Sequence, residues 1–178
     1  MAKYEDDLIA MSAQCKDADE LVKMMRDVGS AADLATDVQG AKGAKGDAAA
    51  EDTAFDELIK KMQALGNAVD ELAKGAKGEA IAAEAARDDA KRATSRALAG
   101  KAADEADKHK VKAEELKRWS STVKDALAQV LQVIGNPTKN KNAGIVAKRA
   151  ELGAEAVERY AKRAKQAATG AKGIANTA

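Results

Sequence analysis

The sequence predicts an all-α protein, an elongated helical bundle or coiled-coil hairpin of four to five helices with one long spine helix. Three observations support this fold class. Alanine, the strongest helix former, supplies much of the 46% of residues that are hydrophobic. The only proline is Pro137, so no proline interrupts the chain before it. Runs of Val, Ile and aromatic residues with the period of two that strands show are absent.

The composition also predicts how the helices pack. Aromatic residues make up 2% of the 178 residues, and alanine buries little apolar area, so a thick globular core is not expected. Helices lined by alanine approach each other closely instead. We therefore expect residues 1–178 to form a single elongated helical domain.

The N-terminal part predicts two helices, over residues 3–28 and 30–39. Gly29 separates them and offers a helix stop. The apolar positions of the first helix alternate in steps of four and three, which is the heptad spacing of a packed seam. They are Tyr4, Leu8, Met11, Cys15, Ala18, Val22 and Met25.

The central part predicts a helix over 52–74 and the spine helix over 79–134. The first has the cleanest heptad seam: Phe55, Leu58, Met62, Leu65, Val69 and Leu72. The first half of the spine has an alanine seam: Ala83, Ala86, Ala90, Ala93 and Ala97. The second half has larger aliphatic side chains on its seam, Leu116, Val123, Leu127, Val130 and Ile134, and Trp119 lies on its flank. Gly100 is a candidate bend within the spine.

The C-terminal part predicts a sharp reversal and a last helix over 142–169. Gly135 followed by Pro137 is the order of residues that ends a helix. The seam of the last helix is Val146, Ala150, Gly153, Val157, Tyr160, Ala164 and Ala167. Residues 170–178 are expected to fray.

The hexapeptide AKGAKG occurs twice, at Ala41–Gly46 and Ala73–Gly78, and a shorter GAKG occurs at Gly170–Gly173. A phosphate-binding loop would follow a buried strand and end in Gly-Lys-Ser or Gly-Lys-Thr, and neither condition is met. The acidic residues that follow, Asp47 and Glu79, would repel phosphate. Repeated glycine residues between helical segments predict hinges between helices.

The residues that catalysis or metal binding would need do not gather in the sequence. His109 is the only histidine, and Glu105 precedes it by four residues rather than by the three of the di-iron Glu-x-x-His motif. Cys15 occupies a seam position, where it packs. Ser120 lies on a helix surface without an oxyanion hole. We therefore expect no enzyme, no cofactor and no metal.

Charge is balanced over the whole chain, at +1, but not along it. Residues 1–40 hold four basic and nine acidic residues, a net of −5, and residues 136–178 hold nine basic and three acidic residues, a net of +6. Opposite ends of this kind attract each other within or between molecules. The candidate assembly or partner contacts are Arg159, Lys162, Arg163, Trp119 and Tyr4.

These features favour a structural protein, a self-assembling subunit of a filament, sheath or particle, and therefore a homo-oligomer. Two alternatives stay open: a leaderless exported protein that acts on membranes or a host partner, and a coiled-coil adaptor. Nucleic acid is a poor fit because acids interleave with the basic residues and no aromatics flank them. The narrow apolar faces would bind a membrane surface weakly. No signal peptide or transmembrane segment is expected, which allows a cytoplasmic, particle-associated or exported location.

Overall fold

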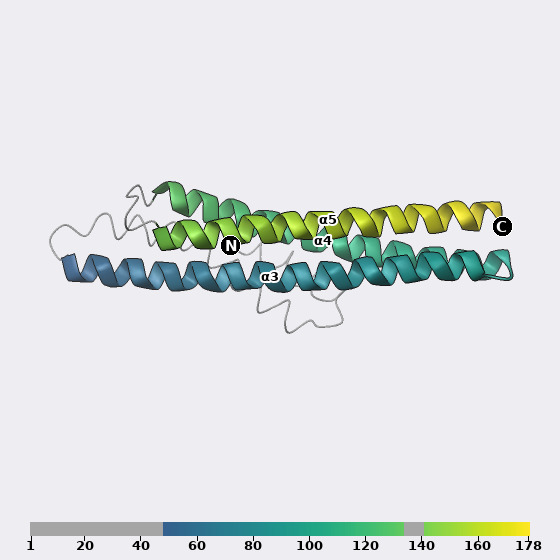
Figure 1. The fold of residues 1–178 in the computed structure, drawn as a ribbon, viewed down its shortest axis with the longest axis horizontal. Coiled ribbons are helices and arrows are strands. Elements are labelled where there is room, and N and C mark those ends of the chain that lie inside the picture. Colours follow the sequence, from purple (N-terminus) through teal and green to yellow (C-terminus); the bar gives the residue numbers. More distant parts are fainter. Residues whose placement is uncertain (1–47, 134–140) are drawn as a thin grey trace, which may run out of the picture. The chain divides into compact units, whose positions relative to one another are not determined.

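A computed structural model describes residues 48–133 and 141–178 of the chain. These residues form three helices packed together: α3 (Ala48–Arg92), α4 (Arg96–Val133) and α5 (Lys141–Thr177) (Figure 1). No strand occurs among them, which confirms the all-α prediction. The helices expected over 3–28 and 30–39, the first AKGAKG and the Gly135–Pro137 stop lie outside the described residues.

Contacts divide the described chain into two compact units, and each contains a part of all three helices. The first unit takes residues 48–69, 122–133 and 141–151. The second takes residues 70–121 and 152–178. The single domain expected from the sequence therefore remains a prediction.

The first unit has a core of bulky aliphatic residues. Met62, Leu65 and Val69 are almost fully buried on α3, as the heptad seam predicted. Val123, Leu127 and Val130 on α4 are buried to the same degree. The side chains of Phe55 and Leu58 lie outside the described part of the structure.

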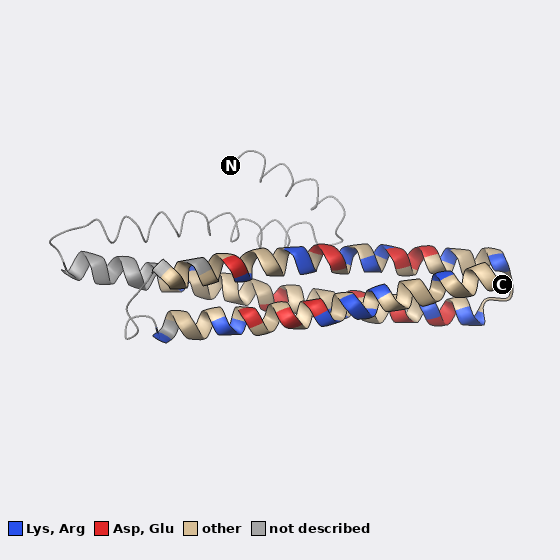
Figure 2. Cartoon of the chain, turned by 90° about the horizontal axis from the view of Figure 1, so that it is seen from above, with Lys and Arg blue, Asp and Glu red and all other residues tan. Residues whose placement is uncertain are grey.

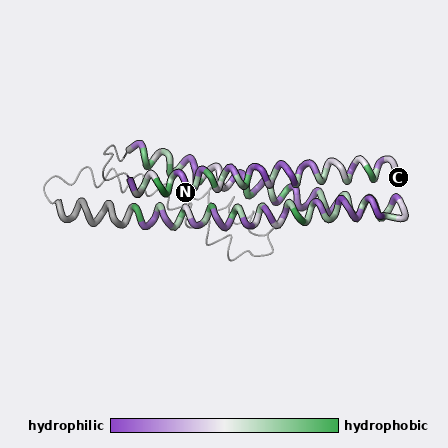
Figure 3. The backbone as a smooth tube through the Cα atoms, viewed as in Figure 1, coloured by the Kyte–Doolittle hydropathy of each residue, from purple (hydrophilic) through white to green (hydrophobic). Residues whose placement is uncertain are grey.

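The second unit has a core made largely of alanine. In Figure 3, hydrophobic residues recur at intervals along each helix between hydrophilic ones. Two clusters hold the three helices together. The first contains Ala80, Ala83, Ala113, Ala161, Ala164 and Ala167, and the second contains Ala86, Ala90, Ala103, Ala106, Ala168 and Ala171. Because the α4 numbers fall between the clusters while those of α3 and α5 rise, α4 runs antiparallel to both.

The second AKGAKG is helical, so the predicted hinge and the predicted helix end at residue 74 were wrong. The helix α3 passes through Gly75 and Gly78 without interruption. A Cβ atom placed on Gly75 would lie 3.3 Å from Leu116 Cδ1, and one on Gly78 would meet nothing within 4 Å. Gly75 therefore lets α4 approach α3 closely. The good helix formers on either side maintain the helix at both glycines.

Replacing Gly78 by alanine is expected to stabilise the protein by about 0.5–1 kcal/mol, because alanine loses less backbone entropy in a helix and its methyl group meets open space here. Gly75→Ala is the matched control from the same hexapeptide, and its methyl group must displace Leu116. Urea denaturation of both variants measures the difference. A gain for Gly75→Ala equal to that of Gly78→Ala would show that the close approach at Gly75 has no energetic weight.

The long spine helix predicted over 79–134 is two helices, so that prediction was wrong as well. The chain turns at Ala93–Ser95, and α4 then runs through Gly100, the candidate bend, without a break. The amide of Leu98 donates to Ser95 Oγ at 3.3 Å, so Ser95 caps the new helix. The turn leaves Ala97 exposed, although the seam had placed it in the interior.

The C-terminal residues continue α5 to Thr177, where fraying from residue 170 had been predicted. Ala171 is fully buried in the second alanine cluster, and Ile174 and Ala175 pack against the same cluster. This contact holds the last turns of α5 against α3 and α4. The helix also begins at Lys141, one residue before the predicted start.

Candidate functional site

Polar contacts between helices lie at the edges of the alanine core in the second unit. His109 on α4 lies beside Glu79 on α3, with 2.5 Å between Nδ1 and Oε2. Since a carboxylate only accepts, the imidazole Nδ1–H donates this bond. Glu105, the acid four residues before His109 in the sequence, instead accepts a hydrogen bond from Lys108 on its own helix. The contact therefore links two helices rather than two turns of one helix.

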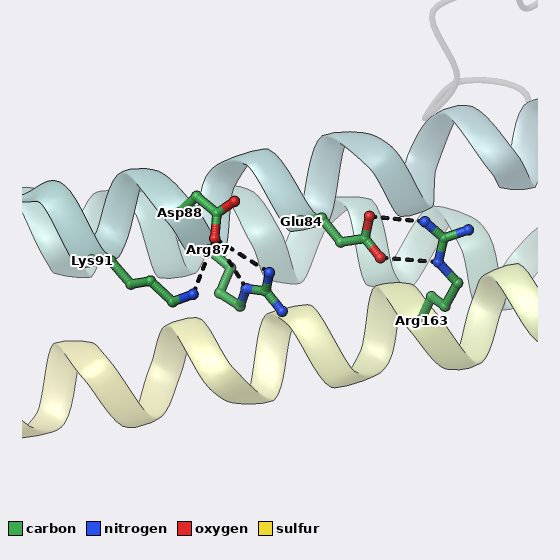
Figure 4. A network of polar contacts seen from close by, with 5 residues as sticks. All are labelled: Glu84, Arg87, Asp88, Lys91 and Arg163. Carbon is green, nitrogen blue, oxygen red and sulfur yellow. Dashed lines mark hydrogen bonds and ion pairs between the residues drawn. The ribbon is translucent and has the colours of Figure 1, made fainter.

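A second interhelical contact joins Arg163 on α5 to Glu84 on α3. Arg163 donates two parallel hydrogen bonds, from Nε and Nη2 to the two carboxylate oxygens, each 2.9 Å long (Figure 4). These bonds lower the pKa of Glu84 and raise that of Arg163. The guanidinium also lies 5.6 Å from the centre of the Tyr160 ring. The two-bond geometry fixes the orientation of both side chains.

Arg87 lies near this contact, at the edge of α3 that faces α5. Its guanidinium donates to Asp88 Oδ1, which also accepts from Lys91 (Figure 4). Those hydrogen bonds lower the pKa of Asp88, that of Lys91 contributing most. The aliphatic stem of Arg87 crosses over Gly170, where a Cβ atom would lie 3.2 Å from Cδ of the arginine. The first glycine of GAKG thus makes room for an arginine stem.

The predicted partner contacts have different surroundings. Arg159 and Lys162 are exposed on α5, and neither makes an ion pair within the described part of the chain. Arg163 is bound to Glu84 of the same chain. Trp119 is 9% exposed, so little of its ring reaches the surface. Tyr4 lies outside the described residues. Their contribution to partner binding stays a prediction.

An apolar stripe on α3 was missed in the sequence. Ile81 is 51% exposed, and Gly78 and Ala85, three residues before and four after it, are exposed on the same side of the helix. Ile81 is a large aliphatic residue outside the α3 seam, and this position was the sign in the sequence that its side chain would be exposed. We call Gly78, Ile81 and Ala85 the α3 stripe.

Elsewhere on the second unit, exposed apolar residues have charged neighbours. Val111 on α4 is 41% exposed and has Asp107 and Glu115 four residues away on either side. Figure 2 shows Lys and Arg alternating with Asp and Glu along the described helices. Ile81 also has charged neighbours, Lys77 four residues before it and Glu84 three residues after it, but on the other side it is flanked by the small, uncharged Gly78 and Ala85.

The described residues offer little for chemistry at a metal or a nucleophile. No group of three or more His, Cys, Asp or Glu residues that could hold a metal ion occurs in 48–133 and 141–178. Ser120 is fully buried, and its hydroxyl donates to the backbone carbonyl of Lys117 at 2.9 Å. Over the same ranges, no helix has the length and apolar character needed to cross a membrane.

Comparisons with models of known protein families, with characterised proteins and with solved structures find no match to this chain.

Proposed function

We propose that this protein is a structural helical subunit that assembles with further copies of itself through the α3 stripe. The observation that carries the proposal is the exposure of Ile81 between Gly78 and Ala85. A large aliphatic side chain flanked by small residues is a surface that another helix can approach closely. Small residues also join α3 to α4 and α5 inside the second unit, where the buried members of both clusters are alanine.

The charge distribution supports side-by-side association between copies. Arg159 and Lys162 are exposed without an ion pair among the described residues, and exposed acids such as Asp89 lie on α3. An exposed ion pair contributes less than about 1 kcal/mol and is screened by salt. Several such pairs would orient neighbouring copies, while the α3 stripe would supply most of the affinity.

Ile81→Glu is expected to reduce self-association, because it places a charge at the centre of the stripe and would bury that charge in the interface. Val111→Glu is the matched control, since it adds the same charge at an exposed aliphatic position in already charged surroundings. Light scattering over a concentration series, with negative-stain microscopy, measures mass and shape. Circular dichroism checks that both variants keep their helix content.

Three other outcomes would each contradict part of this proposal. A wild-type chain that stays monomeric at high concentration would exclude homo-assembly, and binding of that monomer to liposomes would favour the membrane-active alternative. Assembly that survives in Ile81→Glu would place the interface elsewhere. Assembly that is unchanged in Arg159→Glu/Lys162→Glu and over a tenfold salt range would show that these cations are only solvated. Arg163 is left unchanged in that variant because it binds Glu84.

A further inference from the structure

The single histidine of the chain takes part in a contact between two helices. His109 and Glu79 are separated by 30 residues in sequence and are joined by the 2.5 Å contact between Nδ1 and Oε2. Their side chains are 27% and 24% exposed, so both are half-buried yet reachable by water and protons. Imidazole is the side chain that ordinarily changes charge between about pH 5 and 8.

The surroundings give this contact unusual weight. The neighbouring core cluster consists of alanine from all three helices, including Ala80 next to Glu79 and Ala113 one turn after His109. Alanine contributes one methyl group to a core, and the free energy of burial scales with the apolar area removed from water. A polar contact at the edge of such a core is therefore a larger share of what holds α3 to α4 than it would be beside leucine.

The charged groups around His109 come from each packed helix. On α4, Glu105 precedes His109 by four residues and is bound by Lys108, and Lys112 follows by three residues. The hydrogen bond from Lys108 is the main cause of the lowered pKa of Glu105, and attraction to His109 is one of the smaller causes. On α5, Tyr160 packs against the alanine cluster, and Arg163 is held by Glu84. The group in direct contact with the imidazole is the Glu79 carboxylate on α3.

We propose that His109 and Glu79 form a pH-responsive clip between α3 and α4. With a neutral imidazole the clip is a single hydrogen bond from Nδ1–H to the carboxylate. When the imidazole takes up a proton at Nε2, the same contact becomes an ion pair with a charge-assisted hydrogen bond, which is roughly twice as strong. The ion pair forms only when the two helices are packed together.

The sign of the pH effect follows from proton binding. A folded state that stabilises the protonated imidazole binds more protons than the unfolded chain, so the unfolding free energy falls as pH rises and increases as pH falls. Acidification from about pH 8 to about pH 5.5 therefore tightens the clip.

Glu115, on α4, must be separated from this effect. Burial raises the pKa of Glu115, so the folded state favours its protonated form and its contribution to stability also decreases as pH rises. The neutral variant Glu115→Gln removes that contribution and leaves His109 and Glu79 in place. It is the background in which the clip is best tested.

The experiment compares thermal unfolding of Glu115→Gln with and without His109→Gln or Glu79→Gln, followed by circular dichroism between about pH 8 and pH 5.5. With the clip intact, acidification should lower the unfolding equilibrium constant about threefold to tenfold more than in either clip variant. Parallel pH curves for all three proteins would overturn the proposal. Unfolding of the His109→Gln variant at both ends of the range would also overturn it, since the contact would then be required whatever its charge.

Discussion

Replacing Leu65 by alanine is expected to lower the free energy of unfolding by about 2–5 kcal/mol, the range for truncation of a fully buried leucine. Leu65 is 1% exposed and lies between the buried residues Met62 and Val69 on α3. The substitution removes three carbon atoms from the most densely aliphatic part of the described structure and leaves a cavity. Urea denaturation followed by circular dichroism measures the loss.

Leu152→Ala is the matched control for this substitution. Leu152 is 54% exposed on α5, so its truncation should change stability by no more than about 0.5 kcal/mol. Ala90→Gly, at a buried helical alanine, should cost about 1 kcal/mol through backbone entropy alone. Equal losses for Leu65→Ala and Ala90→Gly would show that α3 is not packed as described in the first unit.

Enlarging the alanine core should be damaging too. Ala164→Leu inserts three carbon atoms into a cluster whose other members come from all three helices, and overpacking of this kind typically costs about 1–3 kcal/mol and sometimes more. The larger effect is expected here because no flexible side chain in the cluster can move aside: its buried members are all alanine. The loss is read from the urea midpoint.

Ala97→Leu provides the control for added bulk, because Ala97 is exposed in the first turn of α4. It should leave stability nearly unchanged. A stable and fully helical Ala164→Leu variant would mean that the helices of the second unit separate readily. That result would contradict the close approach of α3, α4 and α5 around this cluster.

Bulky seams were the part of the fold that the sequence predicted best. Leu65 and Val69 on α3, and Leu127 on α4, are buried where the heptad spacing placed them. Large aliphatic residues gain most from burial, so their spacing determines which face of a helix turns inward. Alanine gives a weaker signal because it occurs on both faces, and Ala97 shows the resulting error.

Helix ends were predicted less well because glycine has more than one use. Gly75 and Gly170 look like stops in sequence, yet each accommodates a side chain from another helix, Leu116 in one case and Arg87 in the other. Only the tertiary contact distinguishes the two uses. The real break follows Arg92, where Ser95 was an available N-cap signal within an alanine-rich stretch.

The polar contacts between helices could not be predicted, since they depend on which turn of one helix faces which turn of the other. Glu84 and Arg163 are separated by 79 residues, and neither carries a sequence motif. The basic character of α5 was recognised, but Arg163 proved to be bound within its own chain. Trp119 was expected at the flank of a seam and is largely buried.

The alanine core of the second unit has a consequence for the register of its helices. An alanine face is nearly smooth and repeats every turn, so sliding one helix along another by a heptad would restore much the same contacts. Three polar pairs oppose such a slip: His109 with Glu79, Arg163 with Glu84, and Lys117 with Glu158, whose Nζ and Oε1 atoms lie 3.3 Å apart. The first pair joins α4 to α3, the second joins α5 to α3, and the third joins α4 to α5. Together these pairs favour one alignment of the three helices over the others that the alanine contacts alone would allow.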